Sequence, residues 1–157
     1  MARRRVQSIL ELGVGVGQRA MRMIEIAARF HSTPDVRYVG IDPFEGRSAM
    51  DGPGVTLKMA HRLLHATGAR VQLIPGDPFA GLSRTANSLG KVDLLVVSGR
   101  LDPQQLAKAW FYVPRLLHEQ SVVLMEKQLP GGHTSVRSAA DDEIETLAAA
   151  AAGRRAA

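Results

Sequence analysis

Residues 9–17, with the sequence ILELGVGVG, join an aliphatic run to three alternating glycines. The aliphatic run predicts a buried strand over residues 6–12, and residues 18–31 have the apolar spacing of an amphipathic helix. Glycines at a strand-to-helix turn let a ligand approach the main chain, because no Cβ blocks it. The stretch therefore predicts a strand, a ligand-binding turn and a helix. The alternative is a turn whose glycines serve only close packing of the helix on the strand.

Strands and helices continue to alternate along the rest of the chain. Further strands are predicted over residues 36–41, 70–74, 92–97 and 121–125, and further helices over residues 55–67, from 102 to about 114, and from about 141 onward. This alternation predicts an α/β fold with a doubly wound, mainly parallel Rossmann-like sheet of about five strands. Residues 1–137 are expected to form the domain. Residues 138–157 are expected to form an alanine-rich helix, either part of that domain or an interaction tail.

The composition is typical of a folded protein with a single domain. The chain has 157 residues, of which 45% are hydrophobic and 22% charged, close to the average for globular proteins. It has no cysteine, which excludes disulfides, thiolate metal sites and a cysteine nucleophile. The apolar run near the N-terminus is too short for a signal peptide or a membrane span. These features predict a cytoplasmic protein without a membrane partner.

The excess of basic residues raises the question of nucleic-acid binding. The net charge is +5 and the isoelectric point is near 10.2. The basic residues are nevertheless scattered, and they cluster only at residues 3–5 and 154–155, at the two ends of the chain. Aromatic residues, on which single-stranded bases would stack, make up only 4% of the sequence. A nucleic-acid partner is therefore disfavoured.

An aspartate follows the second predicted strand. Asp42 stands where a carboxylate can accept hydrogen bonds from both hydroxyls of an adenine-linked ribose. A turn residue or helix cap before Pro43 is the alternative interpretation. A dinucleotide-binding pattern, G-x-G-x-x-A, also fits residues 15–20. Asp42, however, comes 25 positions after Gly17 rather than about 20, which disfavours a nicotinamide-dependent enzyme.

Three segments together resemble the class I S-adenosylmethionine-dependent methyltransferases: residues 11–17 (ELGVGVG), 38–45 (YVGIDPFE) and 76–78 (GDP). The resemblance implies that S-adenosylmethionine is the cofactor, that the glycine loop faces its methionine part and that the aspartate after the second strand binds the ribose. It also implies that Pro43 or Phe44 covers an adenine face. Asp77 would bind the adenine amino group, with an ordinary turn residue as the alternative. The cofactor-binding residues predicted in this way are Glu11, Gly13, Gly15, Gly17, Asp42, Pro43, Phe44, Gly76, Asp77, Pro78 and Ser98.

The chain departs from this family's pattern where catalytic groups are expected. In many members the fourth strand ends in an acidic or asparagine-containing segment beside the transferable methyl group, whereas here it ends in residues 98–100 (SGR). Asp102 is a candidate catalytic base from the following loop, or else it caps a helix that starts at Pro103. His118 is a second candidate base, expected to reach the C-terminal edge of the sheet, with a surface position as its alternative.

Two histidines have the spacing of a helical metal pair. His61 and His65 lie four positions apart, but Lys58 and Arg62 share their stripe and oppose a cation. A solvated helix face is the better interpretation. No metal site is predicted.

Two functions fit these observations. The favoured one is methyl transfer from S-adenosylmethionine to a small-molecule acceptor, with catalysis that rests on proximity and orientation. Residues 40–46 (GIDPFEG) are most similar to the O-methyltransferases that act on sugars and antibiotics. The alternative is a degenerate, non-catalytic S-adenosylmethionine-binding or interaction module. A sheet that stops at five strands leaves residues 121–125 near an uncovered edge, which predicts a homodimer.

Overall fold

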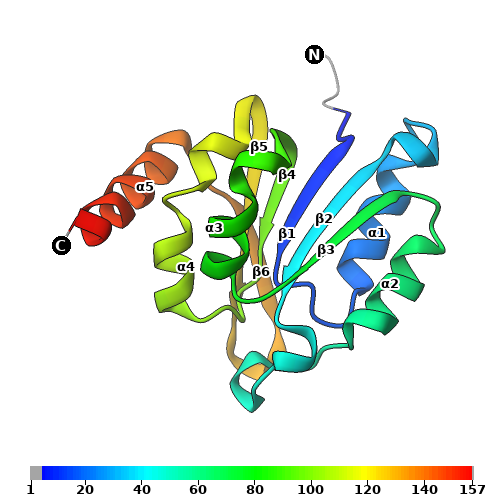
Figure 1. Ribbon diagram of the computed structural model, residues 1–157, viewed down its shortest axis with the longest axis horizontal. Coiled ribbons are helices and arrows are strands. Elements are labelled where there is room, and N and C mark those ends of the chain that lie inside the picture. The colour runs from blue at the N-terminus through cyan, green and yellow to red at the C-terminus, as the bar shows by residue number, and fades with distance from the viewer. Residues whose placement is uncertain (1–4, 157) are drawn as a thin grey trace.

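Residues 5–156, which the computed structural model describes, form a six-stranded sheet with helices packed on both of its faces (Figure 1). The strands are β1 (Ser8–Leu12), β2 (Arg37–Asp42), β3 (Arg70–Pro75), β4 (Val92–Val97), β5 (Leu117–Gln128) and β6 (Thr134–Ser138). The helices are α1 (Gln18–Ala27), α2 (Leu57–His65), α3 (Pro78–Leu89), α4 (Pro103–Ala109) and α5 (Asp141–Ala156). Short 3₁₀ helices lie at Thr33–Asp35, Phe44–Gly46, Ala49–Asp51, Val113–Leu116 and Pro130–Gly132.

The strands follow the order β3-β2-β1-β4-β5-β6 across the sheet. β1 lies in the interior and pairs in parallel with β2 on one side and β4 on the other, so that Leu10 stands between Val39 and Leu95. The pairs β2–β3 and β4–β5 are also parallel, whereas β6 runs antiparallel to β5. The strand order changes direction between β1 and β4. In open α/β sheets, ligands bind outside the carboxyl ends of the strands at such a switch point.

The expected count of about five strands is wrong by one, because β6 adds a sixth. Its sequence, TSVRS, has one aliphatic residue and every residue is exposed, so it lacks the apolar pattern by which the other strands were predicted. Main-chain pairing with β5 holds it in place, for example between Glu126 and Val136. β6 therefore covers the edge of β5, and the uncovered edge from which a homodimer was predicted does not exist.

The helices divide into two groups that cover opposite faces of the sheet (Figure 1). One group, α1 and α2, packs on the half of the sheet nearest β1, β2 and β3, with a core formed by Ile9, Ile24, Tyr38 and Leu64. The other group, α3, α4 and α5, covers the opposite face, with a larger core that includes Leu10, Leu95, Leu116 and Val123. Trp110 and Tyr112, predicted to be core residues, are both buried there. The doubly wound arrangement is as predicted.

Two elements differ from the sequence prediction: α3 was not predicted, and β5 is longer than predicted. α3 occupies a segment in which no helix was predicted, because Gly81 and several small polar residues blur its apolar stripe. Its start is nevertheless well defined, since Asp77 caps it and Pro78 is its first residue. β5 begins four positions earlier than predicted, and its register against β4 shifts between Val92 and Leu94. Sequence periodicity does not reveal such an irregular strand.

The C-terminal helix α5 packs against the rest of the fold through Ile144 and Ala151, which are buried. Near its end, the Arg155 guanidinium lies 4.5 Å from the centre of the Phe111 ring and donates a hydrogen bond of 2.6 Å to Tyr112 Oη. The C-terminal basic cluster thus contributes to packing. In the N-terminal cluster, residues 3 and 4 lie outside the described residues.

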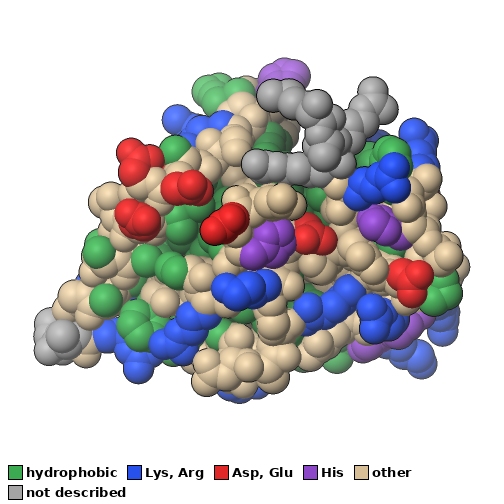
Figure 2. Space-filling view, turned by 90° about the horizontal axis from the view of Figure 1, so that it is seen from above, with side chains coloured by type: hydrophobic (Ala, Val, Ile, Leu, Met, Phe, Trp, Pro, Cys, Tyr) green, Lys and Arg blue, Asp and Glu red, His purple; other side chains and the backbone are tan. Residues whose placement is uncertain are grey.

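Figure 2 shows the end of the molecule at which the parallel strands begin, with Lys and Arg side chains dispersed among acidic and uncharged ones. A continuous basic stripe, as a nucleic-acid-binding face would have, is not visible on this face. Within residues 5–156, no helix has the length and apolar character needed to cross a bilayer.

Candidate functional site

A pocket of about 500 Å³, open to solvent, lies at the carboxyl ends of the parallel strands. It spans the switch point between β1 and β4, because both the glycine loop after β1 and the loop after β4 contribute to its wall. The sequence-predicted residues that line it are Gly13, Gly15, Asp42, Pro43, Gly76, Asp77, Pro78, Ser98 and Asp102. The fold therefore gathers residues from four loops, separated by up to 89 positions, around one pocket.

Gly13 forms the wall between the glycine loop and the loop after β4. Its φ is +90°, and a Cβ at this position would lie only 2.7 Å from Ser98 Cβ. The main chain is held on both sides, since Gly13 N donates to Ile41 O at 2.8 Å and Ser98 N donates to Leu12 O at 2.9 Å. Only glycine combines this backbone angle with this close approach. The bare main chain of the loop is thereby exposed to the pocket.

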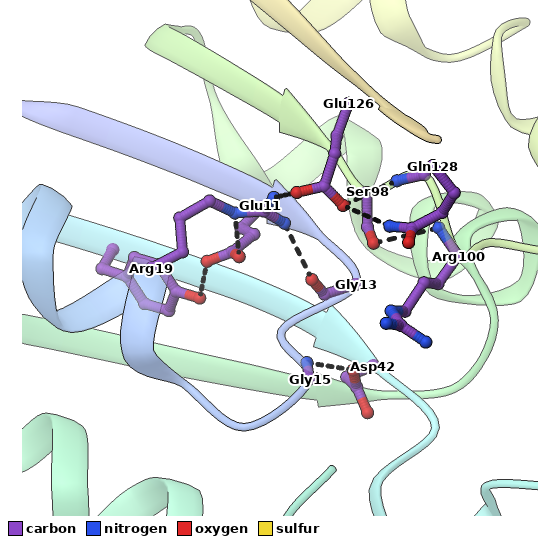
Figure 3. Close-up of polar contacts among 11 residues, drawn as sticks. Glu11, Gly13, Gly15, Arg19, Asp42, Ser98, Arg100, Glu126 and Gln128 are labelled. Carbon is purple, nitrogen blue, oxygen red and sulfur yellow. Dashed lines mark hydrogen bonds and ion pairs between the residues drawn. The ribbon is translucent and has the colours of Figure 1, made fainter. Parts of the chain in front are cut away.

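Asp42 lies at the end of β2 with 2% of its surface exposed, and it connects the glycine loop to the loop that follows it. Its Oδ2 accepts a hydrogen bond of 2.9 Å from Gly15 N (Figure 3). Its Oδ1 accepts one of 2.9 Å from Phe44 N. Arg47 Nη2 also contacts Oδ1, at 2.5 Å. A carboxylate has about four lone-pair sites. Asp42 thus retains acceptor capacity on Oδ2, on the side of the glycine loop.

Arg47 is a pocket residue that sequence reasoning missed. Its guanidinium is 14% exposed, and its Nη1 donates to the carbonyl groups of Asp51 and Gly52 at 2.9 and 3.2 Å. It therefore fastens the loop after β2 onto Asp42. The spacing of five residues between Asp42 and Arg47 was visible in the sequence, but only the turn after β2 brings the two side chains together.

Two further carboxylates in the pocket wall cap helices. Asp77 Oδ1 accepts a hydrogen bond of 2.8 Å from Ala80 N at the start of α3, and Asp102 Oδ1 accepts one of 2.9 Å from Gln104 N at the start of α4. The alternative interpretation of both residues, as a turn or cap, is thus realised in their contacts. Their positions in the pocket wall still allow each second oxygen to meet a ligand.

The loop after β4 contributes Ser98 and Arg100 to the pocket. Ser98 Oγ accepts a hydrogen bond of 3.2 Å from Arg100 N (Figure 3), which turns the chain at the end of the strand. Arg100 is exposed at the pocket wall. The pocket thus contains a hydroxyl and a cation at the position where many class I methyltransferases have an acid, the departure that the sequence had indicated.

Three predicted cofactor residues do not reach the pocket wall. Glu11 has no exposed surface, and it accepts hydrogen bonds from Arg19 Nε at 2.9 Å and from Tyr38 Oη at 2.6 Å. Burial raises the pKa of the Glu11 carboxyl above its ordinary value, against the lowering effect of the Arg19 guanidinium. Gly17 begins α1. Phe44 is buried beneath the glycine loop against Val14, so that Pro43 alone is available to cover an adenine face.

The expectation that His118 reaches the catalytic edge of the sheet is wrong. His118 is the second residue of β5 and lies at the amino end of the sheet, where its Nε2 is 2.8 Å from Asp93 Oδ1. The early start of β5 and its register shift place the residue there. The prediction failed because the strand was thought to begin three residues after this histidine.

The histidine pair on α2 forms a stacked contact on the helix surface. His61 and His65 have ring centroids 5.2 Å apart and ring nitrogens 3.1 Å apart. Among the described residues, no group of three or more potential metal ligands comes together. The pair lies on an exposed face of α2, the interpretation that the sequence favoured.

The structure is similar to solved methyltransferases of low sequence identity. Aeropyrum pernix fibrillarin, solved with natively bound S-adenosyl-L-methionine, superposes with a TM-score of 0.58 over 80% of this chain at 20% identity. A TehB-like S-adenosylmethionine-dependent methyltransferase from Corynebacterium glutamicum superposes with a TM-score of 0.52 over 95% of this chain at 19% identity. The chain has the fold of class I S-adenosylmethionine-dependent methyltransferases.

The chain covers only part of each of the solved structures that it resembles. Precorrin-6y C5,15-methyltransferase from Geobacter metallireducens gives a TM-score of 0.52 over 82% of this chain at 18% identity. The chain spans 47% of the fibrillarin, 66% of the TehB-like protein and 58% of the precorrin enzyme, so it is shorter than each of these relatives in fold. No family model matches the sequence, and no curated protein matches it.

Proposed function

We propose that this protein binds S-adenosylmethionine in the pocket at the carboxyl ends of β1 and β4 and transfers its methyl group to a small-molecule acceptor. The observation that carries the proposal is the pairing of Gly15 with Asp42 in one pocket wall. It places an exposed glycine main chain beside a buried carboxylate with spare acceptor capacity. The class I methyltransferase fold supports the same conclusion.

The residues present fit the parts of this cofactor. Asp42 Oδ2 would accept a ribose hydroxyl, Pro43 would cover the adenine, and Asp77 would accept from the adenine amino group. The bare main chain at Gly13 and Gly15 would hold the amino-acid part, because both glycines line the pocket and neither has a side chain. When bound, the cofactor supplies an electrophilic methyl group on a sulfonium.

The chemistry that this chain adds is mainly positioning. The pocket carboxylates at Asp77 and Asp102 already accept main-chain hydrogen bonds, so they are fixed in place. Holding two reactants in line can by itself supply about 7–11 kcal/mol of the barrier reduction. Asp102 remains the candidate to accept a proton from an acceptor hydroxyl, from its place in the wall after β4.

Calorimetric titration with S-adenosylmethionine and S-adenosylhomocysteine tests the proposal. We expect both to bind the wild-type protein, and we expect Asp42→Ala to weaken binding by about tenfold or more, equivalent to about 1.4 kcal/mol. An acceptor screen with labelled S-adenosylmethionine would then identify methyl transfer. A wild-type protein that binds neither ligand at millimolar concentration would contradict the proposal.

Asp93→Ala is the matched control for Asp42→Ala. Both aspartates accept two main-chain N–H groups and contact one basic side chain, but Asp93 lies at the opposite end of the sheet. We expect Asp93→Ala to lower the free energy of unfolding and to leave the affinity for S-adenosylhomocysteine unchanged. Equal losses of affinity in both variants would show that general destabilisation, and not a ribose contact, explains the effect of Asp42→Ala.

The binding and methyl-transfer experiments also test the alternative function, and a separate measurement tests the homodimer. Tight binding without methyl transfer to any acceptor would favour the non-catalytic S-adenosylmethionine-binding module. The cytoplasmic location and the homodimer stay predictions from the sequence, although β6 covers the edge on which the homodimer was based. Light scattering at micromolar concentration checks the homodimer, and a clean monomer would contradict it.

A further inference from the structure

Near its end, β5 carries a carboxylate that was not predicted as a site residue from the sequence and that does not line the pocket. Glu126 is the antepenultimate residue of β5, and its side chain is 15% exposed. The parallel pairing of β5 with β4 brings this end of the strand beside the loop after β4. Figure 3 shows Glu126 between the glycine loop on one side and residues 98–100 on the other.

On the side of the glycine loop, Glu126 is connected through Arg19. Arg19 Nη1 donates to Glu126 Oε2 at 2.7 Å, its Nε donates to Glu11 Oε1 at 2.9 Å, and its Nη2 donates to Gly13 O at 3.3 Å. One guanidinium therefore bridges two carboxylates and the main chain of the pocket wall. Its planar fork of donors suits this geometry, whereas a lysine could not reproduce it.

On the side of β4, the other oxygen of Glu126 holds the turn at Gly99. Glu126 Oε1 accepts from Gly99 N at 3.2 Å and from Gln128 Nε2 at 3.3 Å. Gly99 lies directly on the main chain of β5, since a Cβ there would be only 2.8 Å from Glu126 O. The turn that carries Ser98 and Arg100 into the pocket thus rests on β5.

We infer that Glu126 and Arg19 are positioning residues that hold together two neighbouring parts of the pocket wall, the glycine loop at Gly13 and the β4 loop at Ser98. This inference rests on the proposed function, because it assumes that the amino-acid part of the cofactor lies against these two loops. Neither residue touches the pocket. Arg19 acts through the carbonyl of Gly13, which lines the pocket. Glu126 acts through the N–H of Gly99, whose two neighbours in the chain line it.

The inference predicts a selective loss of affinity. The ligand part that lies against Gly13 and Ser98 would depend on the contacts of Glu126 and Arg19. The adenosine part would lie instead beside Asp42 and Asp77. Two probes separate these parts: S-adenosylhomocysteine, and 5′-methylthioadenosine, which keeps the adenosine and lacks the amino-acid part. A variant that merely loosened the protein would weaken both to the same extent.

Titration calorimetry of Glu126→Gln with both probes tests the inference, with unliganded thermal unfolding measured alongside. Glutamine keeps the shape of the side chain but removes the ion pair with Arg19. We expect affinity for S-adenosylhomocysteine to fall by about fivefold or more and affinity for 5′-methylthioadenosine to change by less than about twofold. Arg19→Lys is the second variant and should show the same pattern. In the double variant, the loss should be smaller than the sum of the two single losses, because both substitutions remove the same ion pair.

Glu119→Gln is the matched control, since Glu119 is an exposed glutamate at the other end of β5, and it should alter neither affinity. Unchanged S-adenosylhomocysteine binding in Glu126→Gln and Arg19→Lys would overturn the inference, and so would equal losses for both probes. Either result would leave the proposed function standing, because the wild-type protein still binds. A wild-type protein that binds neither probe would instead overturn the proposed function, and the inference with it.

Discussion

At the carboxyl ends of β1 and β4, loops that follow four strands surround the candidate site, whereas at the amino ends polar side chains join the starts of neighbouring strands. At the amino end, Asp93 Oδ2 accepts hydrogen bonds from Gln7 N and Ser8 N, each at 2.9 Å, and Oδ1 contacts His118 Nε2. Ser8 Oγ in turn accepts from Asp93 N, and Ser121 Oγ donates to Val92 O.

The comparison teaches that residue type alone does not mark a site in this fold. The amino end contains an aspartate, a histidine and two serines within contact of each other, a set that would suit catalysis by composition. Its polar atoms nevertheless join the starts of β1, β4 and β5. The carboxyl end keeps main chain and acceptor capacity free, because the loops there leave the sheet in different directions. Under the proposed function, position along the parallel strands, and not residue type, separates the ligand-binding polar groups from those that join strands.

The largest effect on ligand affinity is expected from adding a side chain at Gly13, in the pocket wall. Gly13→Ala combines a Cβ that would meet Ser98 with a left-handed backbone angle, so the loop must move. We expect affinity for S-adenosylhomocysteine, measured by calorimetry, to fall by about thirtyfold or more, equivalent to about 2 kcal/mol.

Gly90→Ala is the matched control for this variant. Gly90 also has a left-handed angle, with φ of +71°, but a Cβ there meets nothing within 4 Å, and the residue precedes β4 at the amino end. It should lower stability by about 1 kcal/mol and leave binding intact. If Gly90→Ala weakened binding as much as Gly13→Ala, the distinction between the two ends would not hold.

An intermediate effect is expected from breaking the network at the amino end. Asp93→Ala removes the acceptor of two main-chain N–H groups, and partly exposed hydrogen bonds of this kind contribute about 0.5–1.5 kcal/mol each. We expect the free energy of unfolding, measured with urea, to fall by about 1–2 kcal/mol. A stability equal to that of the wild-type protein would show that the network does not hold the strands together.

The pH dependence of stability sharpens the same comparison. Partial burial would raise the pKa of Asp93, but hydrogen bonds from the main chain of Gln7 and Ser8 and from His118 lower it below its ordinary value of 3.8. A carboxyl whose pKa is lowered by folding stabilises the protein above its unfolded pKa, and this contribution is lost as the pH falls through the folded pKa. The stability difference between wild type and Asp93→Ala should therefore be full at pH 6 and shrink below about pH 4. Urea unfolding at several pH values measures it, and a constant difference would contradict it.

The smallest effect is expected from His118. His118→Gln removes a contact between side chains that are 33% and 30% exposed, and partly exposed pairs contribute about 0–1 kcal/mol. We expect a loss of about 0.5 kcal/mol in the free energy of unfolding, with no change in ligand affinity or in any methyl transfer found. A selective loss of methyl transfer would return His118 to the catalytic candidates.

The sequence was sufficient for the architecture and for much of the pocket. Apolar runs identify β1 to β4, and the glycines together with Asp42 and Asp77 locate the loops that surround the cavity. Local patterns failed where pairing decides the structure. β6 has almost no apolar signal, and it exists because β5 offers its edge.

Contacts between distant segments were the other part that the sequence could not supply. Arg19 and Glu126 are separated by 107 positions, and nothing in either neighbourhood indicates a partner. Phe44 illustrates a third limit. It follows Asp42 as an aromatic cofactor contact would, but the turn there gives it a φ of +49° and directs its side chain into the core.

The interior position of β1 has a consequence for how the chain folds during synthesis. β1 is the first described strand, yet it needs β4 on one side, and the contact between Gln7 and Asp93 joins residues 86 positions apart. Until β4 leaves the ribosome, an almost entirely buried apolar strand has one edge without a partner, and such edges promote aggregation. Insertion of β4 should thus be the slow step that ends this exposure, since contacts of long sequence separation form late. Substitutions in β4 would then lower the yield of soluble protein more than equally destabilising substitutions in α5.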